Sequence, residues 1–266
     1  RPASRSMTDR SRAGNPLWAA YEYLAMVVGL GSLAVLCLIW LPCALILNFL
    51  VPRRLGQPLG RAVISWGFRF YLRILTVFCA CRFDVDEIDR LRDQGPLIVA
   101  ANHPSLLDAV MIVSRLPNAV CVMKAALMDN LLFGAAARLA RYIRNDAALD
   151  VILGARDELQ QGAHLIIFPE GSRTLNFPVD ACSPSVGLIA SRSKVDVQTL
   201  LIEFSTPYLG KVWPLFRRPA LPLTCRVRLG RRFSPPTNIQ AFTAELDGYF
   251  RFEFGQKTPS TVAFAA

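Results

Sequence analysis

The longest apolar stretch of this chain lies near its N-terminus. From Leu24 to Val51 no side chain carries a charge, and about 20 apolar residues in a helix are enough to cross a bilayer. Gly29, Gly31 and Pro42 are points at which such a helix could break. Two alternatives therefore stay open: one helix that crosses the membrane, or two shorter helices that enter it and return to the same side.

A second helical pattern follows over residues 60–80. Arginines fall on one face, and the apolar positions include Trp66, Phe68, Phe70 and Tyr71. A helix of this kind can lie in the headgroup layer of a membrane. The ordinary alternative is a surface helix that packs on a folded domain, and the sequence does not separate the two.

Beyond about Phe83, short apolar runs alternate with helical patterns. Apolar runs of about four to eight residues bounded by turn residues are typical of buried strands. Alternating strands and helices predict an α/β domain with a mixed, largely parallel central sheet flanked by helices. The expected strands are 96–101, 119–123, 163–168, 197–203 and 224–229, and the expected helices are 106–115, 125–141, 149–161 and 239–252.

These patterns divide the chain into five segments. A basic tail (1–22) precedes the membrane-crossing or re-entrant segment (23–52), and a basic amphipathic helix (53–80) precedes the folded α/β domain (81–256). The last segment, 257–266, is expected to be disordered.

The charge of the chain is strongly positive. Its 30 Lys and Arg residues face 20 Asp and Glu residues, which gives a net charge of +10 at pH 7. A basic and apolar chain favours an anionic membrane surface or anionic substrates. No zinc-finger, helix-turn-helix or RNA-recognition motif is present, so nucleic acid is not an expected partner. The seven cysteines show no metal-ligand spacing; we expect free thiols and no metal site.

Basic residues flank both ends of the apolar stretch. The C-terminal flank is the more basic, because several arginines precede its first acidic residue, Asp84. Basic flanks tend to remain in the cytoplasm. We therefore expect the α/β domain on the cytoplasmic side of the membrane.

The first candidate catalytic residues follow the strand expected at 96–101. His103 and Asp108 lie five residues apart. A histidine can accept a proton from an attacking hydroxyl, and a carboxylate can hold the ring in the right tautomer and stabilise the imidazolium. Of the two histidines in the chain, His103 is the better candidate, because His164 begins a strand that is expected to be buried.

Two other interpretations of this segment stay open. Ser105 and Asp108 have the spacing of a helix capping box, in which Asp108 would be structural and His103 an ordinary loop residue. Ser105 could also act as a nucleophile and form a covalent intermediate. It lies only two residues from His103, and no GxSxG turn is present, so we favour direct attack by a substrate hydroxyl.

The second candidate follows the strand expected at 163–168. Gly171 allows a sharp turn there, and Arg173 can then present its guanidinium to a phosphate or carboxylate. Glu170 is expected to orient Arg173 or to bond an acceptor hydroxyl. The alternative is a plain β-turn with a surface ion pair, which would stabilise the fold little. Both candidates follow expected strands, where sites gather in open α/β sheets.

The segments 102–108 (NHPSLLD) and 168–174 (FPEGSRT) resemble the NHxxxxD and FPEGxR motifs of the glycerolipid (lysophospholipid) acyltransferase superfamily, which includes 1-acylglycerol-3-phosphate O-acyltransferases. The resemblance covers about residues 82–232. It implies acyl transfer from a thioester to a hydroxyl at a membrane surface, with His103 as the base and Asp108 as the residue that orients it. The implied substrate-binding residues are Asn102, Ser105, Lys124, Arg144, Glu170, Gly171, Ser172 and Arg173.

The same resemblance implies the partners of the reaction. The donor would be acyl-CoA or acyl carrier protein, used as a thioester co-substrate, and no bound cofactor is expected. Membrane lipids are the other expected partners. The basic stretch 211–232 could receive the donor, an acidic carrier protein or anionic headgroups. The expected location is the inner (cytoplasmic) membrane of a bacterium, with the catalytic domain facing the cytoplasm.

The acceptor side departs from the family pattern. Members that act on lysophosphatidic acid often carry an arginine in a G-x-x-x-x-D-R segment, whereas residues 141–146 read RYIRND and only Arg144 could substitute. The segments 208–214 and 216–219 resemble acyltransferases of bacterial aryl-polyene clusters. That likeness implies the main alternative function, transfer of a specialised acyl group from a carrier protein onto a lipid or sugar. A non-catalytic membrane scaffold is a third alternative, and the intact first motif argues against it.

Overall fold

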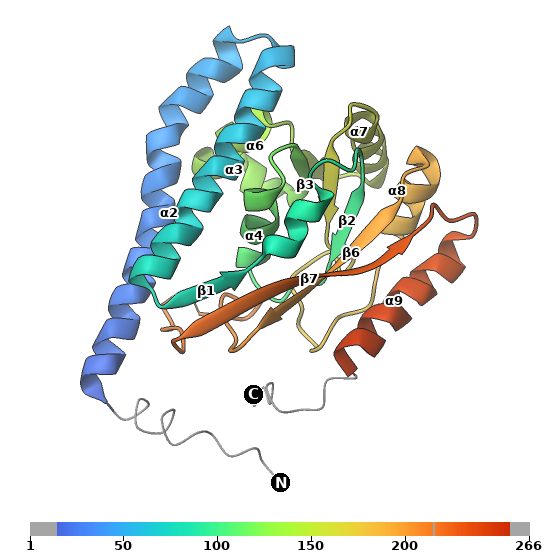
Figure 1. Cartoon of the computed structure of the whole chain (residues 1–266). Coiled ribbons are helices and arrows are strands. Elements are labelled where there is room, and N and C mark those ends of the chain that lie inside the picture. Colours follow the sequence, from blue (N-terminus) through green and yellow to red (C-terminus); the bar gives the residue numbers. More distant parts are fainter. Residues whose placement is uncertain (1–14, 215, 256–266) are drawn as a thin grey trace.

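The fold is built around one seven-stranded sheet (Figure 1). The computed structural model describes residues 15–214 and 216–255, and the strand order is β1-β7-β6-β2-β5-β3-β4. All neighbouring strands run parallel except β6 and β7, which pair antiparallel. The predicted mixed, largely parallel sheet is confirmed.

All five expected strands are present, with ends that shift by a few residues. The structure adds two edge strands, β1 and β4, which the apolar pattern did not predict because each is short and partly exposed. The strands are β1 (Cys81–Asp84), β2 (Ile98–Ala101), β3 (Ala119–Lys124), β4 (Ile143–Asn145), β5 (His164–Ile167), β6 (Val197–Phe204) and β7 (Leu223–Phe233).

The helix expected over 125–141 is two helices, so that prediction is wrong. Asn130 follows α5, and its side chain accepts a hydrogen bond from the Leu132 amide at the start of α6. The sequence pattern also did not predict α8, which is short and contains serine and glycine. The helices of this part are η1 (Asp86–Leu91), α4 (Leu107–Arg115), α5 (Ala125–Asp129), α6 (Leu131–Leu139), α7 (Ala148–Gln160), α8 (Ser185–Ser193) and α9 (Ile239–Gly255).

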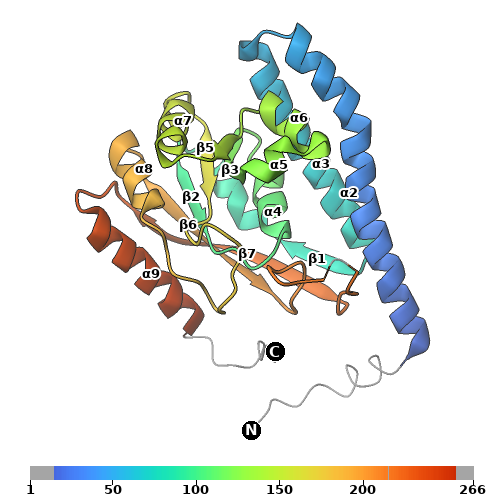
Figure 2. The same cartoon turned by 180° about the vertical axis from the view of Figure 1, so that it is seen from behind.

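Helices cover both faces of the sheet (Figures 1 and 2). On β2, Val99 and Ala101 belong to a core shared with α3 and α4, whereas Ile98 and Ala100 belong to a core shared with α7, α8 and α9. Successive side chains of a strand point to opposite faces. Since both faces are buried, the loops that can bind ligands lie at the ends of the strands.

Two long helices pack beside this sheet as an antiparallel pair (Figures 1 and 2). α2 (Pro16–Leu50) and α3 (Arg53–Phe78) are joined by a two-residue turn. α2 continues through Gly29 and Pro42, so the structure shows one unbroken helix in place of two shorter ones. A Cβ at Gly29 would lie 3.2 Å from Leu75, which shows that this glycine allows α3 to approach closely.

The start of α2 corrects one segment boundary. The helix begins at Pro16, inside the expected basic tail (1–22), because Asn15 caps it by accepting a hydrogen bond from the Leu17 amide at 2.9 Å. Residues 1–14 and the expected disordered tail, 257–266, lie outside the described residues.

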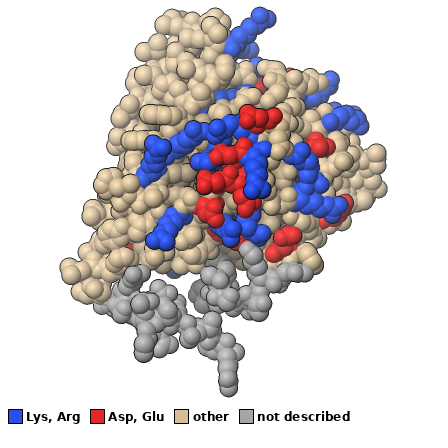
Figure 3. Space-filling model, viewed as in Figure 1, with Lys and Arg blue, Asp and Glu red and all other residues tan. Residues whose placement is uncertain are grey.

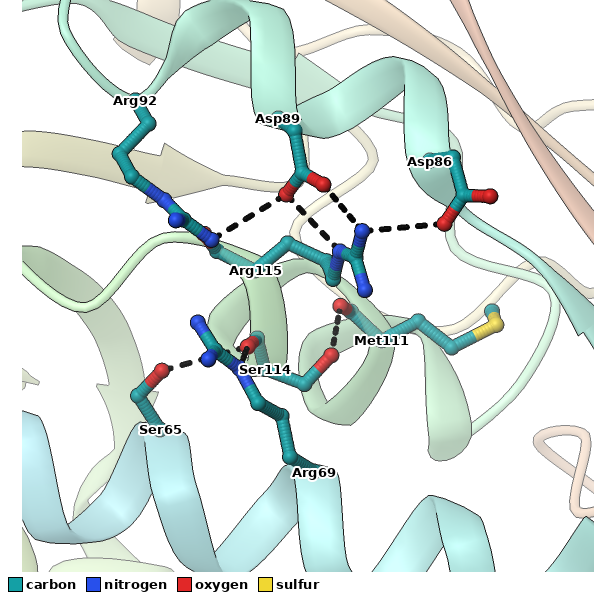
Figure 4. Close-up of polar contacts among 8 residues, drawn as sticks. All are labelled: Ser65, Arg69, Asp86, Asp89, Arg92, Met111, Ser114 and Arg115. Atoms are coloured by element: carbon teal, nitrogen blue, oxygen red, sulfur yellow. Dashed lines mark hydrogen bonds and ion pairs between the residues drawn. The ribbon is translucent and has the colours of Figure 1, made fainter.

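A charged network fastens η1 and α3 to the C-terminal end of α4 (Figure 4). Arg69 donates to the Ser114 carbonyl at 2.6 Å. Arg92 donates to the Arg115 carbonyl at 3.2 Å, and Arg115 pairs with Asp89. Cations near the last carbonyls of a helix are favourable. On this face of the molecule acidic side chains gather in the middle and basic side chains surround them (Figure 3).

Candidate active site

The ends of three adjacent strands bring the two sequence motifs together. β2, β5 and β6 are parallel, with β2 in the middle, so the loops that follow them meet at one edge of the sheet. His103 follows β2, the second motif follows β5, and the segment 205–211 follows β6. Residues that are far apart in the sequence therefore build a single site.

His103 and Asp108 are in direct contact. Nδ1 of His103 lies 2.8 Å from Oδ2 of Asp108. The Asp108 side chain is fully buried, whereas 15% of the His103 side chain is exposed. Burial raises the pKa of Asp108 to about 6, and the contacts with His103 and the Ser105 amide oppose that rise. At neutral pH the carboxylate is mostly ionised and can accept Nδ1–H, which leaves Nε2 as the proton acceptor.

The same carboxylate organises the start of α4. Oδ2 of Asp108 accepts from the Ser105 amide at 2.8 Å, and Ser105 Oγ accepts from the Leu107 amide at 3.2 Å. The first bond is that of a capping box, whereas the hydroxyl accepts from the Leu107 amide in place of the Asp108 amide. The two interpretations of the first motif are therefore compatible, because one oxygen serves both the helix start and the ring. Within the described part of the chain, the buried Oδ1 has no hydrogen-bond partner.

The second motif fixes the plane of the histidine ring. His103 stacks on Phe168, with ring centroids 3.8 Å apart and ring planes at 13°. Phe168 directly follows β5. A ring that is held by a carboxylate at its edge and by an aromatic side chain on its face needs little reorganisation before it accepts a proton.

Glu170 binds backbone groups of both motif loops. Its Oε1 accepts from the His103 amide at 2.8 Å and from the Thr174 hydroxyl at 2.9 Å. Its Oε2 accepts from the Asp180 amide at 2.9 Å. Burial raises the pKa of Glu170, and these bonds oppose the rise. The expectation that Glu170 orients Arg173 is therefore wrong, because its oxygens join the loops instead.

Arg173 points at the segment that follows β6. Its Nη1 donates to the carbonyls of Leu209 and Gly210, at 2.9 and 2.7 Å. Gly171 has a φ of +68°, which lets the backbone turn sharply before Arg173. Burial lowers the pKa of Arg173, and the charge of Asp108 opposes that shift. The guanidinium thus stands at the edge of the site, half-buried and already oriented.

Lys211 is a neighbour of the site that the sequence singled out only as part of a basic stretch. Its Nζ donates to Ser172 Oγ at 3.0 Å. The signal that would have identified it is the strand order: β6 lies next to β2, so the loop after β6 must pass close to His103. Lys211 and Arg173 place two cations beside the motif loops.

Two predicted substrate-binding residues are buried in the structure. Asn102 exchanges two hydrogen bonds with the backbone of Ile202, at 2.9 and 2.8 Å, and so extends the pairing of β2 with β6. Ser105 uses its hydroxyl in the cap of α4. Their contacts place both side chains in the scaffold of the site.

Lys124 and Arg144 lie further along the sheet. Lys124 ends β3 and Arg144 lies in β4, two and three strands from β2. At about 4.8 Å for each strand these separations are roughly 10 and 14 Å. Arg144 also pairs with Asp129 and Asp146, which neutralise its guanidinium. The structure does not bring Arg144 to His103.

Metal-binding clusters are not found among residues 15–214 and 216–255, where no three His, Cys, Asp or Glu side chains could hold an ion together. All seven cysteines are free. Burial raises the pKa of Cys81 and of Cys121 to about 12, so these two thiols are neutral at physiological pH.

Part of the chain matches a protein family and a known protein. Residues 82–203 match the family model described as Acyltransferase, and that range contains both motifs. The chain is 29% identical over 126 residues to 1-acyl-sn-glycerol-3-phosphate acyltransferase beta of Homo sapiens. The match covers 43% of this chain and 42% of that protein, so it spans less than half the length of this relative.

A solved structure is similar over nearly the whole fold. The crystal structure of the 1-acyl-sn-glycerophosphate (LPA) acyltransferase PlsC from Thermotoga maritima superposes with a TM-score of 0.64 at 16% sequence identity. The similarity covers 92% of this chain and 99% of that chain, which includes the α2–α3 pair. The chain therefore contains a segment that matches the Acyltransferase family model, and its fold is similar to that of this PlsC.

Proposed function

We propose that the protein is an O-acyltransferase that moves a fatty acyl group from a thioester donor to the hydroxyl of a lysophospholipid or a glycerol-phosphate-type acceptor. The observation that carries this proposal is the 2.8 Å contact between His103 Nδ1 and the buried carboxylate of Asp108. It orients the ring so that Nε2 can act on a hydroxyl. The matched acyltransferase domain supports the same reaction class.

The proposed reaction has one general base and no acyl-enzyme. Nε2 of His103 takes the proton as the acceptor oxygen attacks the thioester carbonyl, and Asp108 stabilises the imidazolium that forms. The carbon–sulfur bond then breaks, and the imidazolium returns the proton to the leaving thiolate. The products are an ester and a free thiol, so no bound cofactor is required. The donor is acyl-CoA or acyl carrier protein.

The acceptor is proposed to bind through its phosphate. Nη1 of Arg173 is occupied by two carbonyls, and within residues 15–214 and 216–255 the rest of the guanidinium has no hydrogen-bond partner and can meet an anion. Lys211 adds a second cation nearby. The Gly171 turn, Ser172 and Glu170 position these groups. Lys124 lies closer to the site than Arg144 and is the better candidate for the far end of an acceptor.

The membrane is proposed to be the place of the reaction. α2 is long and apolar enough to cross a membrane, and many of its large apolar side chains are exposed. It also packs against α3, and it contacts α6 where Asn48 donates to the Ala135 carbonyl at 3.0 Å. Because α2 is packed against the folded domain, we propose that the α2–α3 pair inserts into one leaflet of the bilayer only. That leaflet is the cytoplasmic one of the inner membrane.

A second candidate function rests on the segment after β6. Lys211 contacts the second motif, and Arg217 lies over the Trp213 ring at 4.7 Å. This cationic and aromatic surface beside the site would suit an acidic carrier protein as donor. The alternative is therefore transfer of a specialised acyl group, of the aryl-polyene kind, from carrier protein to a lipid or sugar.

The experiment measures ester formation by the purified full chain in detergent. Palmitoyl-CoA and palmitoyl carrier protein are compared as donors, with lysophosphatidic acid, glycerol 3-phosphate and lysophosphatidylcholine as acceptors. We expect turnover with an anionic acceptor and at least about a thousandfold loss in His103→Ala. The variant loses the Phe168 stacking and the Asp108 contact, so its thermal midpoint is measured as well, to show that it is folded under the assay conditions. Wild-type turnover in a folded His103→Ala protein would disprove the mechanism.

A further inference from the structure

A cavity of about 480 Å³ lies far from His103. It is formed where the α2–α3 turn meets the end of α6, the start of β4 and the end of α7. The cavity meets the sheet at Ile143 in β4, three strands or roughly 14 Å from β2, which His103 follows, and its lining residues belong to neither motif loop. The cavity is therefore separate from the candidate active site.

Arginines dominate the charge of this cavity. Arg53, Arg138 and Arg141 line it, together with Asp157 and Glu158. The negative charge of Glu158 is already compensated, since Glu158 forms an ion pair with the buried Arg61. It also accepts from Gln57 at 2.7 Å and lies 3.6 Å from Arg141. Glu158 is thus shared by Arg61 and Arg141, and Arg53 and Arg138 face Asp157, so positive charge is in excess and the cavity favours an anion.

Arg141 stands in the C-terminal cap of α6. Its φ is +57°, in the left-handed region, at the second position after the last residue of the helix. The Arg141 amide donates to the Arg138 carbonyl at 3.1 Å and the Tyr142 amide donates to the Ala137 carbonyl at 2.9 Å, which are the bonds of a Schellman motif. Glycine is the usual residue at this position, so the cap itself does not need the Arg141 side chain, which lines the cavity.

Arg53 is a cation at a helix N-terminus, a position that favours negative charge. It is the first residue of α3, and the first turn of this helix contains no acidic residue. A cation at a helix N-terminus opposes the helix dipole, which favours anions there. A bound anion would be stabilised by both the arginine and the helix end.

The surroundings of the cavity indicate what kind of anion it takes. α2 ends at Leu50 beside the cavity, and Leu50, Leu55 and Leu131 are all largely exposed. Exposed leucines on the elements that form a cationic cavity match the boundary between lipid chains and headgroups. We propose that this cavity binds the phosphate of an anionic phospholipid headgroup, at a second lipid site that is distinct from the site of acyl transfer.

The test compares two glycine substitutions with the same backbone effect. Arg141→Gly removes the cavity arginine and relieves the left-handed strain. Lys194→Gly is the matched control, because Lys194 has the same φ of +57°, is exposed, and lies after α8 away from the cavity. Both variants should unfold at or above the wild-type temperature.

Thermal unfolding of the full chain in neutral detergent is then followed with added dihexanoyl-phosphatidylglycerol, dihexanoyl-phosphatidylcholine or inorganic phosphate. Phosphatidylglycerol should stabilise the wild type and Lys194→Gly, and phosphatidylcholine should not. Arg141→Gly should need roughly tenfold more phosphatidylglycerol for the same shift, the size expected for one lost charge-assisted bond. If inorganic phosphate raised the unfolding temperature as much as phosphatidylglycerol does, the cavity would be a phosphate site for a free anion, and the lipid part of the proposal would be wrong.

Two outcomes would overturn the proposal. One is an unchanged phosphatidylglycerol shift in Arg141→Gly. The other is loss of the shift in Arg173→Gln, which would place the lipid in the candidate active site. The readout needs no catalysis, so an inactive protein would refute the proposed function without touching this inference.

Discussion

Asp108 and Glu170 are two buried carboxylates, each in the loop after a central strand, and they do different work. Asp108 gives one oxygen to a side chain, His103, and to the start of α4, and its other oxygen has no partner among the described residues. Glu170 gives both oxygens to the loops, to two backbone amides and one hydroxyl. The difference shows that a buried carboxylate can orient a catalytic side chain in one loop and hold the loops together in another.

The largest effect should come from Asp108→Asn. The amide keeps an oxygen for the Ser105 amide, but it cannot stabilise an imidazolium and favours the wrong ring tautomer. Turnover should fall by about a thousandfold or more, as for other His–carboxylate pairs. Steady-state kinetics with saturating donor and acceptor measures this loss. A variant with normal turnover and only a lower thermal midpoint would reduce Asp108 to a helix cap.

Glu170→Gln should act mainly on stability. The glutamine amide cannot accept from the Asp180 amide while its oxygen still serves the His103 loop. We expect a loss of about 2 kcal/mol in the free energy of unfolding and about a tenfold fall in turnover, because the loops position the ring. Thr174→Val is the control, since it removes only the hydroxyl bond and should cost about 1 kcal/mol. Chemical denaturation measures both. A thousandfold loss of turnover with unchanged stability would make Glu170 a partner in the chemistry.

Arg173→Lys should have a smaller and more selective effect. Lysine keeps the charge and loses the planar fork that binds carbonyls and a phosphate together. The acceptor KM should rise by roughly five- to tenfold, with less change in the donor KM. Initial rates with each substrate varied in turn give both values. A raised donor KM with an unchanged acceptor KM would move Arg173 to the phosphates of the donor.

The mildest perturbation is a change of pH. The pKa of Asp108 is raised to about 6, above its usual value of about 3.9, so the folded state holds a proton that the unfolded chain releases. Its contribution to stability is present below about pH 4 and is lost as the pH rises through about 6. Turnover should change in the opposite direction and reach about half its plateau near pH 6. Between pH 4 and pH 7 the free energy of unfolding should vary less in Asp108→Asn than in the wild type. Equal pH profiles for the two proteins would show that Asp108 is not the group that titrates.

The sheet was predictable because its strands are apolar on both faces. The runs at β2, β5 and β6 stand out in the sequence for that reason. β1 and β4 could not be found in this way, since edge strands are short and half exposed. The break between α5 and α6 depends on one side chain, Asn130, which caps the second helix.

The site was predictable where neighbours in sequence are also neighbours in space. The five-residue spacing of His103 and Asp108 was enough to suggest their contact. The partners of Glu170 and Arg173 depend on the order of strands, which a local pattern does not contain. For the same reason Lys211 was singled out only as part of a basic stretch, and the pattern did not show that Arg144 lies three strands from β2.

The backbone bonds between the three loops have a consequence for how this edge of the sheet moves. Thr174 donates its amide to the His103 carbonyl at 2.7 Å, and Leu106 donates its amide to the Leu209 carbonyl at 3.1 Å. Releasing any one loop therefore breaks bonds to another. These amides should exchange with deuterium together, as one cooperative opening unit. Substrates would then enter the site when the three loops open together, and no single loop would act as a lid.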